Sequence, residues 1–558
     1  MWLYWNKLLI LAFKLKMQPF TKNNLLIAAC YAAVLALGMF LGPKFLKENT
    51  NSRNGAFIPF GSGRDTKIER VLQLIKDNYV DDVKIDTLQY TAIEEILARL
   101  DPHSHFLPPS EARHLDENLE GHFDGIGIEY FIVNDTLLIT SVISNAPASR
   151  AGLTPGDKII KVDKKDIAGT GISSAEAAKL LRGKKGTQVK LKIKPAGKSS
   201  IKEIVVKRAQ ISVSSVDAAY ILAEGTGYIK ISRFGTSTAA DFTAAVNTLK
   251  NAGMKRLVLD LRENGGGYLN AAAELADEFL SEQKLIVYTK GIHEPRTDYY
   301  ATAKGSFESG ELAILVDENT ASASEIVAGA VQDLDRGVIV GRPTFGKGLV
   351  QEQFNFGDGS VLNLTVARYY TPSGRSIQRP YKKGIKAYYH DAYNHFGQGI
   401  KSETKQKDSL HSKNKTYKTA AGRLMYGGGG ISPDIFVPAD TAAYNDFYYQ
   451  ASDKGLLEYF LFNHLIKSGK PDIDYFINTY TISDKEYSLF VTLAFNKGVK
   501  TNKKETEIAK QVLLQEMKAL LGRYYFGDEV FFKVLNASDK VIARSMNALQ
   551  QPDKNLRP

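Results

Sequence analysis

The chain has 558 residues, a formal net charge of +11, and a composition that is 44% hydrophobic and 24% charged. These values indicate a globular protein of several domains and exclude collagen-like, low-complexity and wholly disordered chains. The single cysteine, Cys30, excludes a disulfide framework. No nucleic-acid-binding motif accompanies the positive charge, so we expect no nucleic-acid partner and favour solvated lysine-rich loops over attraction to anionic membranes or cell-wall polymer.

An uncharged apolar run at residues 25–41 has the length of a short membrane-spanning helix. Lysines precede it, which places the N-terminus in the cytoplasm by the positive-inside rule. We favour an uncleaved anchor over a removed signal peptide, and a lipoprotein-type site at Cys30 is a weaker alternative. The prediction is a cytoplasmic segment and transmembrane anchor at 1–45, single-pass in the inner (cytoplasmic) membrane, with the rest in the periplasm or extracytoplasmic space. Met1 and Met17 both remain candidate starts.

Residues 46–120 are predicted to form a linker and an N-terminal helical region. Apolar spacing indicates helices at Ile68–Tyr79 and Ile85–Leu100. His103 and His105 follow in a proline-flanked turn. Two histidines without further ligands at suitable spacing are a weak metal signal, so we expect neither metal nor cofactor.

Residues 121–208 contain three motifs in a fixed order: a glycine loop at 125–128, GLTPGD at 152–157 and LRGKKGT at 181–187. This order resembles a PDZ domain. The resemblance implies that Gly125, Ile126, Gly127 and Ile128 hold a C-terminal carboxylate with backbone N–H groups. It also implies that an extended peptide adds to the strand 128–131, beside a helix at 174–181. The alternative is a module that packs without binding peptide.

Residues 209–437 show strands alternating with helices, which predicts an α/β core. A glycine-rich sequence, DLRENGGG at 260–267, separates a strand from a helix that begins at Leu269. Its glycines permit positive φ angles and close backbone approach, although a plain tight turn would also use them. We expect Arg262 to brace this loop. Residues 355–370 are predicted to form a hairpin around a Gly-Asp-Gly turn.

Ser322 lies where an apolar strand at 312–316 gives way to a helical pattern. Free backbone N–H groups at a helix N-terminus can stabilise an oxyanion. The segment 311–353 has no histidine to activate this serine, but lysine serves as a base when burial lowers its pKa. Lys347 lies between two glycines, and Gln351 would lie on the same face of an extended segment.

The sequences TASASEIVAGAVQD and VGRPTFGKGLVQ, with 25 residues between serine and lysine, resemble the C-terminal processing peptidases, or tail-specific proteases. The resemblance covers roughly residues 66–437. It implies Ser322 as nucleophile, Lys347 as base and Gln351 as the residue that orients the lysine. It also implies an oxyanion hole formed by Ala323 with Gly266 or Gly267, and the layered α/β fold shared with crotonases and ClpP-type proteases.

Four carboxylates lie near these residues in the sequence: Asp317, Glu325, Asp333 and Asp335. A carboxylate beside Lys347 would raise its pKa, so we expect all four to point away or to pair elsewhere. Glu325, in the first helical turn, is expected to serve the helix dipole.

After a lysine- and tyrosine-rich stretch at 381–419, read as a surface loop, residues 438–558 are predicted to form a helical C-terminal region. Helices are expected at 444–449, 456–466, 485–496 and 506–525. Packing on the core is favoured for this region; a homodimer or an adaptor protein remains open.

The whole sequence therefore predicts a multidomain α/β protein, with a PDZ domain at 121–208 ahead of a protease core at 209–437. The function expected is a serine endopeptidase acting on unfolded or tail-exposed proteins. Two alternatives are a catalytically dormant PDZ scaffold that binds protein C-termini and an acyl-transfer enzyme on the crotonase-like fold.

Overall fold

The computed structural model describes residue 34 and residues 66–302, 305–390, 415–439, 441–466 and 469–550. Apart from Val34, the predicted anchor at 25–41 lies outside the described residues. Among those that are described, no helix is both long and apolar enough to cross a membrane. The chain divides into one unit that ends at Ile85 and a second that runs from Asp86 onward.

The first unit contains α3 (Lys67–Asn78), close to the predicted helix. Thr66 caps it, because its hydroxyl accepts the Glu69 N–H at 3.4 Å, and its backbone N–H in turn donates to the Glu69 carboxylate at 2.6 Å. The second unit begins with α4 (Ile85–Leu97), β1 (His105–Leu107) and α5 (Pro109–Glu120). The strand β1 pairs antiparallel with β18 of the later core, which ties this entry segment to the protease region.

The predicted PDZ segment forms an antiparallel sheet in the order β3-β4-β5-β7-β8, with β6 on β5, and β2 pairs separately with β9. Its elements are β2 (His122–Gly125), β3 (Ile128–Val133), β4 (Thr136–Val142), α6 (Pro147–Arg150), β5 (Lys158–Val162), β6 (Lys165–Asp166), α7 (Ser174–Leu181), β7 (Gln188–Lys194), β8 (Lys202–Lys207) and β9 (Ala209–Ser212). In β7 every second residue is buried, so its apolar side chains face one core and its lysines face solvent.

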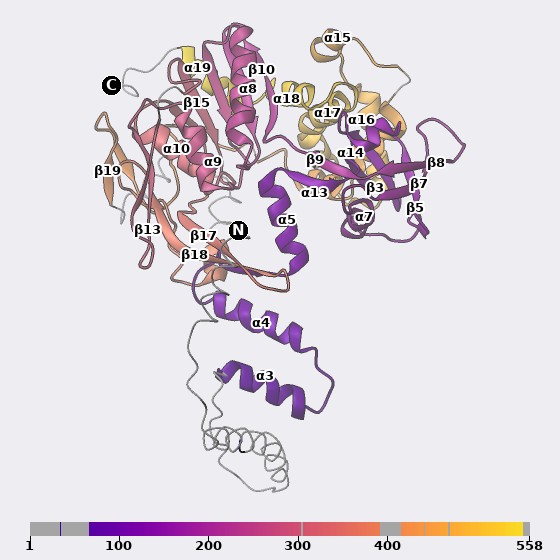
Figure 1. Cartoon of the computed structure of the whole chain (residues 1–558). Helices are drawn as coiled ribbons and strands as arrows, with labels where there is room; N and C mark the ends of the chain where they lie inside the picture. Colours follow the sequence, from indigo (N-terminus) through magenta and orange to yellow (C-terminus); the bar gives the residue numbers. More distant parts are fainter. Residues whose placement is uncertain are drawn as a thin grey trace, which may run out of the picture. The chain divides into compact units, whose positions relative to one another are not determined.

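A six-stranded sheet of order β10-β11-β12-β15-β16-β21 forms the centre of the protease region (Figure 1). Its strands are β10 (Val216–Ala223), β11 (Thr226–Ile231), β12 (Arg256–Asp260), β15 (Glu311–Val316), β16 (Val338–Gly341) and β21 (Ile435–Phe436). All neighbours pair in parallel except β10 and β11. Near-continuous apolar runs suit such a sheet because both of its faces are buried.

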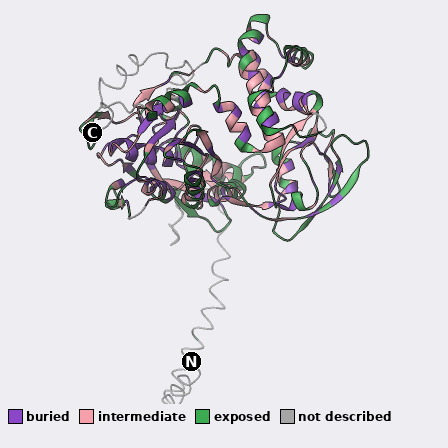
Figure 2. Cartoon of the chain, turned by 90° about the horizontal axis from the view of Figure 1, so that it is seen from above, coloured by how far each residue is buried: buried purple, intermediate pink, exposed green. Residues whose placement is uncertain are grey.

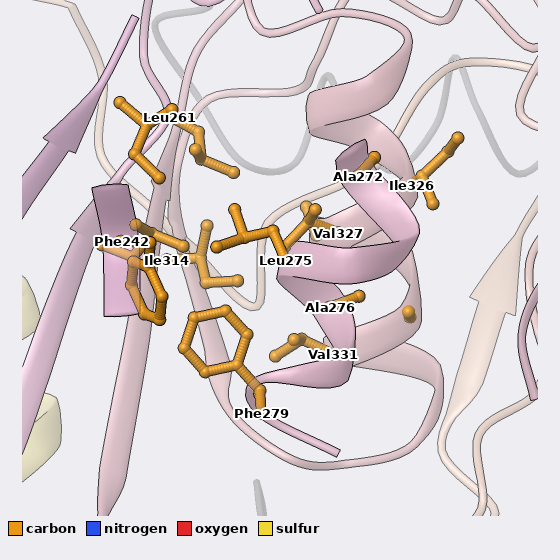
Figure 3. Close-up of a cluster of buried hydrophobic side chains, with 14 of the residues drawn as sticks. Phe242, Leu261, Ala272, Leu275, Ala276, Phe279, Ile314, Ile326, Val327 and Val331 are labelled. Carbon is orange, nitrogen blue, oxygen red and sulfur yellow. The ribbon is translucent and has the colours of Figure 1, made fainter. Parts of the chain in front are cut away.

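Helices cover both faces of this sheet. On one face lie α8 (Thr238–Asn251), α9 (Leu269–Asp277) and α10 (Ala323–Asp333), which pack through the cluster drawn in Figure 3, including Phe242, Leu275 and Val327. On the other face, the last helix, α19 (Lys540–Gln550), buries Val541 and Ile542 against β12, β15 and β16. The layered α/β arrangement predicted for the core is thus confirmed.

A second sheet carries the lysine segment. Its order is β1-β18-β13-β14, with β17 on β18, and the strands are β13 (Leu285–Lys290), β14 (Thr297–Tyr300), β17 (Leu349–Asn355) and β18 (Val361–Tyr370). The predicted hairpin is confirmed. The expectation of a plain loop at 381–419 was wrong in part, because residues 385–390 are helical and β19 (Thr416–Lys418) pairs with β20 (Leu424–Tyr426).

The C-terminal region is helical, as predicted, and its helices carry both buried and exposed residues (Figure 2). Its hydrophobic core is rich in aromatic side chains, including Phe447, Phe460 and Phe490. Its elements are α13 (Asp446–Asp453), α14 (Leu456–Phe460), a π-helical turn (Leu461–Leu465), α15 (Ile473–Asn478), α16 (Asp484–Asn496), α17 (Lys503–Phe526), α18 (Asp528–Asn536) and α19. The helices α15, α18 and α19 were not predicted from the sequence.

Candidate active site

Ser322 occupies the turn between β15 and α10. Its backbone has φ 55° and ψ −115°, a left-handed conformation that is strained for a residue with a side chain. Ala323 begins the helix, and the Glu325 N–H donates to the Ser322 carbonyl at 2.9 Å. Among the hydrogen bonds of the described residues, none uses the Ala323 N–H. A half-buried hydroxyl therefore lies beside an unused backbone donor at a helix N-terminus.

Lys347 lies just before β17, and its Nζ donates to Gln351 Oε1 at 2.8 Å. The Gln351 amide nitrogen in turn donates to the His103 carbonyl oxygen, so the amide oxygen is the end that faces the lysine. Burial lowers the pKa of the Lys347 amine below its usual 10.5, while the charges of Asp101 and Glu325 act in the opposite direction. The amine is thus shifted toward the neutral form that a general base requires.

In the sequence, His103 is a weak metal candidate. In the structure, its side chain lies near the Lys347 amine. Burial and the nearby Lys347 lower the pKa of its imidazole to about 3. Its Nε2 lies 3.0 Å from the Tyr388 hydroxyl, and Asp101 accepts the His103 N–H at 2.8 Å. The histidine is therefore neutral and holds the segment that orients Gln351. In the part of the chain that the structure describes, no three His, Cys, Asp or Glu side chains are grouped to hold a metal.

Glu325 links the serine turn to the lysine loop. Its fully buried carboxylate accepts the N–H of Ser322 at 2.8 Å, of Gly346 at 2.8 Å and of Lys347 at 2.9 Å, together with the Thr344 hydroxyl. Burial raises its pKa to about 7, although each of these donors acts to lower it. The expectation that Glu325 would point away from the lysine was wrong, because the lysine loop folds back over the first turn of α10.

Tyr369, on β18, makes a second link. Its hydroxyl lies 3.0 Å from the Ser322 carbonyl oxygen and 2.7 Å from the Lys347 carbonyl oxygen, so one proton is shared between them. The described hydrogen bonds include none between Ser322 Oγ and Lys347 Nζ. The structure instead brings the two residues together through the backbones that Glu325 and Tyr369 hold.

The glycine loop packs directly on the serine turn. A Cβ added to Gly266 would lie 2.8 Å from Ser322 Cβ and 2.9 Å from the Ala323 nitrogen. The Gly266 N–H already donates to Asn264 Oδ1 at 2.9 Å, whereas no hydrogen bond of the described residues uses the Gly267 N–H. Of the two glycines nominated from the sequence, Gly267 therefore has the available donor.

The other three carboxylates pair elsewhere, as expected. Asp333 contacts Arg375 at 2.8 Å, Asp335 contacts Arg423 at 2.7 Å, and Asp317 accepts the Glu263 N–H at 2.9 Å. These contacts brace the ends of α10 and the glycine loop, and they leave Lys347 without a strong ion pair.

The predicted carboxylate loop lines a pocket of the PDZ segment. Gly127 has φ 80°, and an added Cβ would lie 2.4 Å from Ala146 Cβ, so only glycine fits there. Arg182, at the end of α7, lies over the Phe123 ring and pairs with Glu117 of α5. The lining residues are Phe123, Gly125, Ile126, Gly127, Ile128, Tyr130, Ala178, Leu181 and Arg182.

Comparison with protein-family models places these features in a known group. Residues 225–388 match the model of Peptidase family S41, a segment that contains Ser322, Lys347, Gln351 and both glycines. Over this segment the chain is similar to peptidase family S41. Residues 138–195 match the PDZ domain model, and residues 447–527 match a family of unknown function, DUF8443.

Curated relatives of this chain include two named proteases. The carboxy-terminal processing protease CtpB of Bacillus subtilis (strain 168) is 34% identical over 57% of this chain and 66% of its own length. A probable CtpA-like serine protease of Staphylococcus aureus (strain N315) is 36% identical over 57% of this chain and 63% of its own length. The chain thus spans slightly less than two thirds of each relative.

Among solved structures, the photosystem II D1 C-terminal processing protease shares 27% sequence identity, over 66% of this chain and 86% of that one. The TM-score is 0.33, which carries no argument about a shared arrangement. The similarity to this family therefore rests on the sequence matches.

Three contributors to the site were not assigned from the sequence: the His103 carbonyl, the Glu325 carboxylate as a link, and the Tyr369 hydroxyl. Glu325 carried a usable signal, because a glutamate at the third helical position commonly reaches back to the N-terminal backbone. The other two act through contacts between distant segments, which no local pattern reveals.

Proposed function

We propose that this chain is a serine endopeptidase of the carboxyl-terminal processing type, with Ser322 as nucleophile and Lys347 as general base. The observation that carries the proposal is the partly buried Lys347 amine, lowered in pKa and oriented by Gln351, on a loop bonded to the serine turn. A PDZ scaffold that only binds peptide would not require a buried lysine whose amine is oriented by Gln351.

In the proposed reaction, Ser322 Oγ attacks the peptide carbonyl carbon while Lys347 Nζ accepts the hydroxyl proton. The N–H groups of Ala323 and Gly267 stabilise the oxyanion that forms. Lys347 then returns a proton to the leaving amine as the C–N bond breaks. Water then attacks the acyl-enzyme: Lys347 takes a proton from the water and returns it to Ser322 Oγ as the ester C–O bond breaks. The side-chain rotations that bring Oγ and Nζ into contact belong to this proposal.

The PDZ pocket supports extended or unfolded protein tails as substrates. Backbone N–H groups near Gly127 suit a terminal carboxylate, which every protein has, and β3 offers an edge for strand addition. Capture there raises the concentration of a tail near the protease region. We also propose that the anchor at 25–41 holds the chain in the membrane with its catalytic part outside the cytoplasm, which fractionation with protease protection tests.

The decisive experiment incubates the full-length chain with unfolded casein, with and without a serine-directed fluorophosphonate. Cleavage that the inhibitor stops, together with covalent labelling at Ser322, supports the peptidase. Tail binding without cleavage or labelling would instead favour the PDZ scaffold.

A further inference from the structure

The last helix of the chain is tied by one ion pair to the glycine loop of the candidate active site. Arg262 NH1 lies 2.6 Å from Asp539 Oδ2, and the two side chains are 17% and 18% exposed. The rest of the guanidinium contacts the buried Asp260, with Nε at 3.0 Å and NH2 at 2.6 Å. Low exposure on both sides makes this pair stronger than an ordinary surface salt bridge.

Arg262 directly precedes the loop that lies against Ser322. In that loop the Asn264 carbonyl accepts the Ala321 N–H at 3.0 Å and the Ser324 hydroxyl at 2.9 Å. Gly266 follows with its Cα packed on Ser322. A shift of Arg262 would therefore move the backbone that contacts the serine turn and carries the Gly267 N–H.

Asp539 resists such a shift, because its two carboxylate oxygens contact different groups. Oδ1 caps α19 by accepting the N–H groups of Val541 at 2.7 Å and Ile542 at 3.1 Å. Oδ2 holds Arg262. The helix α19 packs on β12, β15 and β16 of the core sheet. Val541, Ile542 and Leu549 anchor it there, because they are buried in the cluster on that face. One carboxylate thus joins a fixed helix to the catalytic loop.

We propose that Asp539 is a positioning residue for the peptidase reaction, which makes the C-terminal helix part of the catalytic unit. Acting through Arg262, it holds the 263–267 loop so that the Gly267 N–H meets the oxyanion. This inference rests on the proposed function. It goes beyond that function because Asp539 lies outside the segment that the peptidase model matches.

The test uses the full-length chain and the variant Asp539→Asn. Asparagine keeps an oxygen that caps α19, but it removes the negative charge that Arg262 contacts. The matched control is Asp528→Asn, which removes the same charge from an exposed pair with Arg523, 2.6 Å long, in the neighbouring helix. Both variants are assayed for kcat, KM, thermal stability and hydrogen exchange of the amides in residues 262–268.

For Asp539→Asn we expect kcat to fall about ten- to a hundredfold with KM changed less than about twofold, because misplacing an oxyanion donor weakens transition-state binding. Exchange in residues 262–268 should rise, whereas Asp528→Asn should leave both readouts near wild type. Adding Asp539→Asn to Arg262→Gln should cost nothing further, since the two residues act in series.

An unchanged kcat and exchange rate in Asp539→Asn, or additive losses in the double variant, would overturn the inference. A loss of stability with wild-type kcat would also overturn it, since that result leaves only a structural role. If the wild-type chain cleaves nothing, the peptidase proposal fails, and hydrogen exchange still decides whether Asp539 holds the loop.

Discussion

At the scale of single residues, the candidate site depends on two buried ionisable groups that both favour their neutral forms. Burial lowers the pKa of Lys347 and raises that of Glu325 to about 7. A charged Glu325 would favour a charged lysine, so the raised pKa of the carboxyl group works in the same direction as the proposed base.

Replacing Lys347 with arginine tests the base directly. Arginine keeps a positive charge at every accessible pH, so Lys347→Arg should reduce cleavage to background, as should Ser322→Ala. In the wild type, kcat/KM should rise with pH as the amine loses its proton, with a midpoint below 10.5 because burial lowers the pKa. A pH series of initial rates measures this. Activity in Lys347→Arg above that of Ser322→Ala would refute the role.

The raised pKa of Glu325 predicts how the stability of the folded chain changes with pH. Its carboxyl pKa is raised from 4.5 to about 7 in the folded chain, so between these values the folded state binds more protons than the unfolded state. The free energy of unfolding should therefore fall as pH rises through this window. Glu325→Gln cannot ionise and should lack that part of the slope. Urea denaturation from pH 4 to 8 compares the two, with Glu529→Gln, from an exposed pair, as control. Equal slopes in wild type and Glu325→Gln would contradict the assignment.

At the scale of elements, the site is built from turns rather than from the regular parts of the sheet. The serine turn, the glycine loop and the lysine loop come from three separate connections, and Glu325, Tyr369 and Asn264 bond them to one another. The precision of the site therefore depends on close backbone contact between loops.

The glycines of the loop provide a matched pair of substitutions. At Gly266, with φ 102°, an added Cβ would lie 2.8 Å from Ser322 Cβ, whereas at Gly265 an added Cβ meets nothing within 4 Å. Gly266→Ala should therefore lower kcat/KM by about a hundredfold or more, because it displaces the serine turn or the oxyanion donors. Gly265→Ala should stay within about threefold of wild type. Steady-state kinetics on one peptide substrate decides, and equal effects of the two substitutions would contradict the packing described.

Much of this local structure is readable from the sequence. The helix that begins at Leu269 and the hairpin at 355–370 follow from the alternation of strands with helices and from turn residues, and the PDZ resemblance implies the helix at 174–181. The contacts that link separate elements cannot be read from the sequence. Nothing near Gln351 indicates that the His103 carbonyl orients it, because that contact joins positions 248 residues apart. The helices α18 and α19 have only nine and eleven residues, so each gives few apolar repeats in the sequence, and both were missed.

At the scale of the whole molecule, the chain combines a PDZ segment, an α/β core that contains the candidate active site, and a helical region, each with its own hydrophobic cluster. The C-terminal region contacts the other two: Lys497 Nζ lies 3.1 Å from Asn134 Oδ1 of the PDZ segment, and Asn536 Nδ2 lies 2.7 Å from Tyr220 Oη of the core. It is therefore bound to both.

Substrate termini test how these parts cooperate. If the PDZ pocket captures a free carboxylate, amidating the C-terminus of a peptide substrate should raise KM by about tenfold or more and leave kcat little changed, since a charge-assisted contact is lost away from the cleaved bond. Acetylating the N-terminus is the control and should change neither constant. Equal KM values for the free and the amidated peptide would show that the pocket takes no part in substrate capture.

The position of α19 has a consequence for biosynthesis. One face of the central sheet is completed by residues 541–549, which are made after every strand of that sheet. Until they emerge from the ribosome, Val258, Leu315 and Val340 lack their cover and Arg262 lacks its second carboxylate. A growing chain therefore carries the serine and the lysine long before it has the helix that completes their surroundings. Any peptidase activity would then begin only after residues 541–549 have been made and have packed on the sheet.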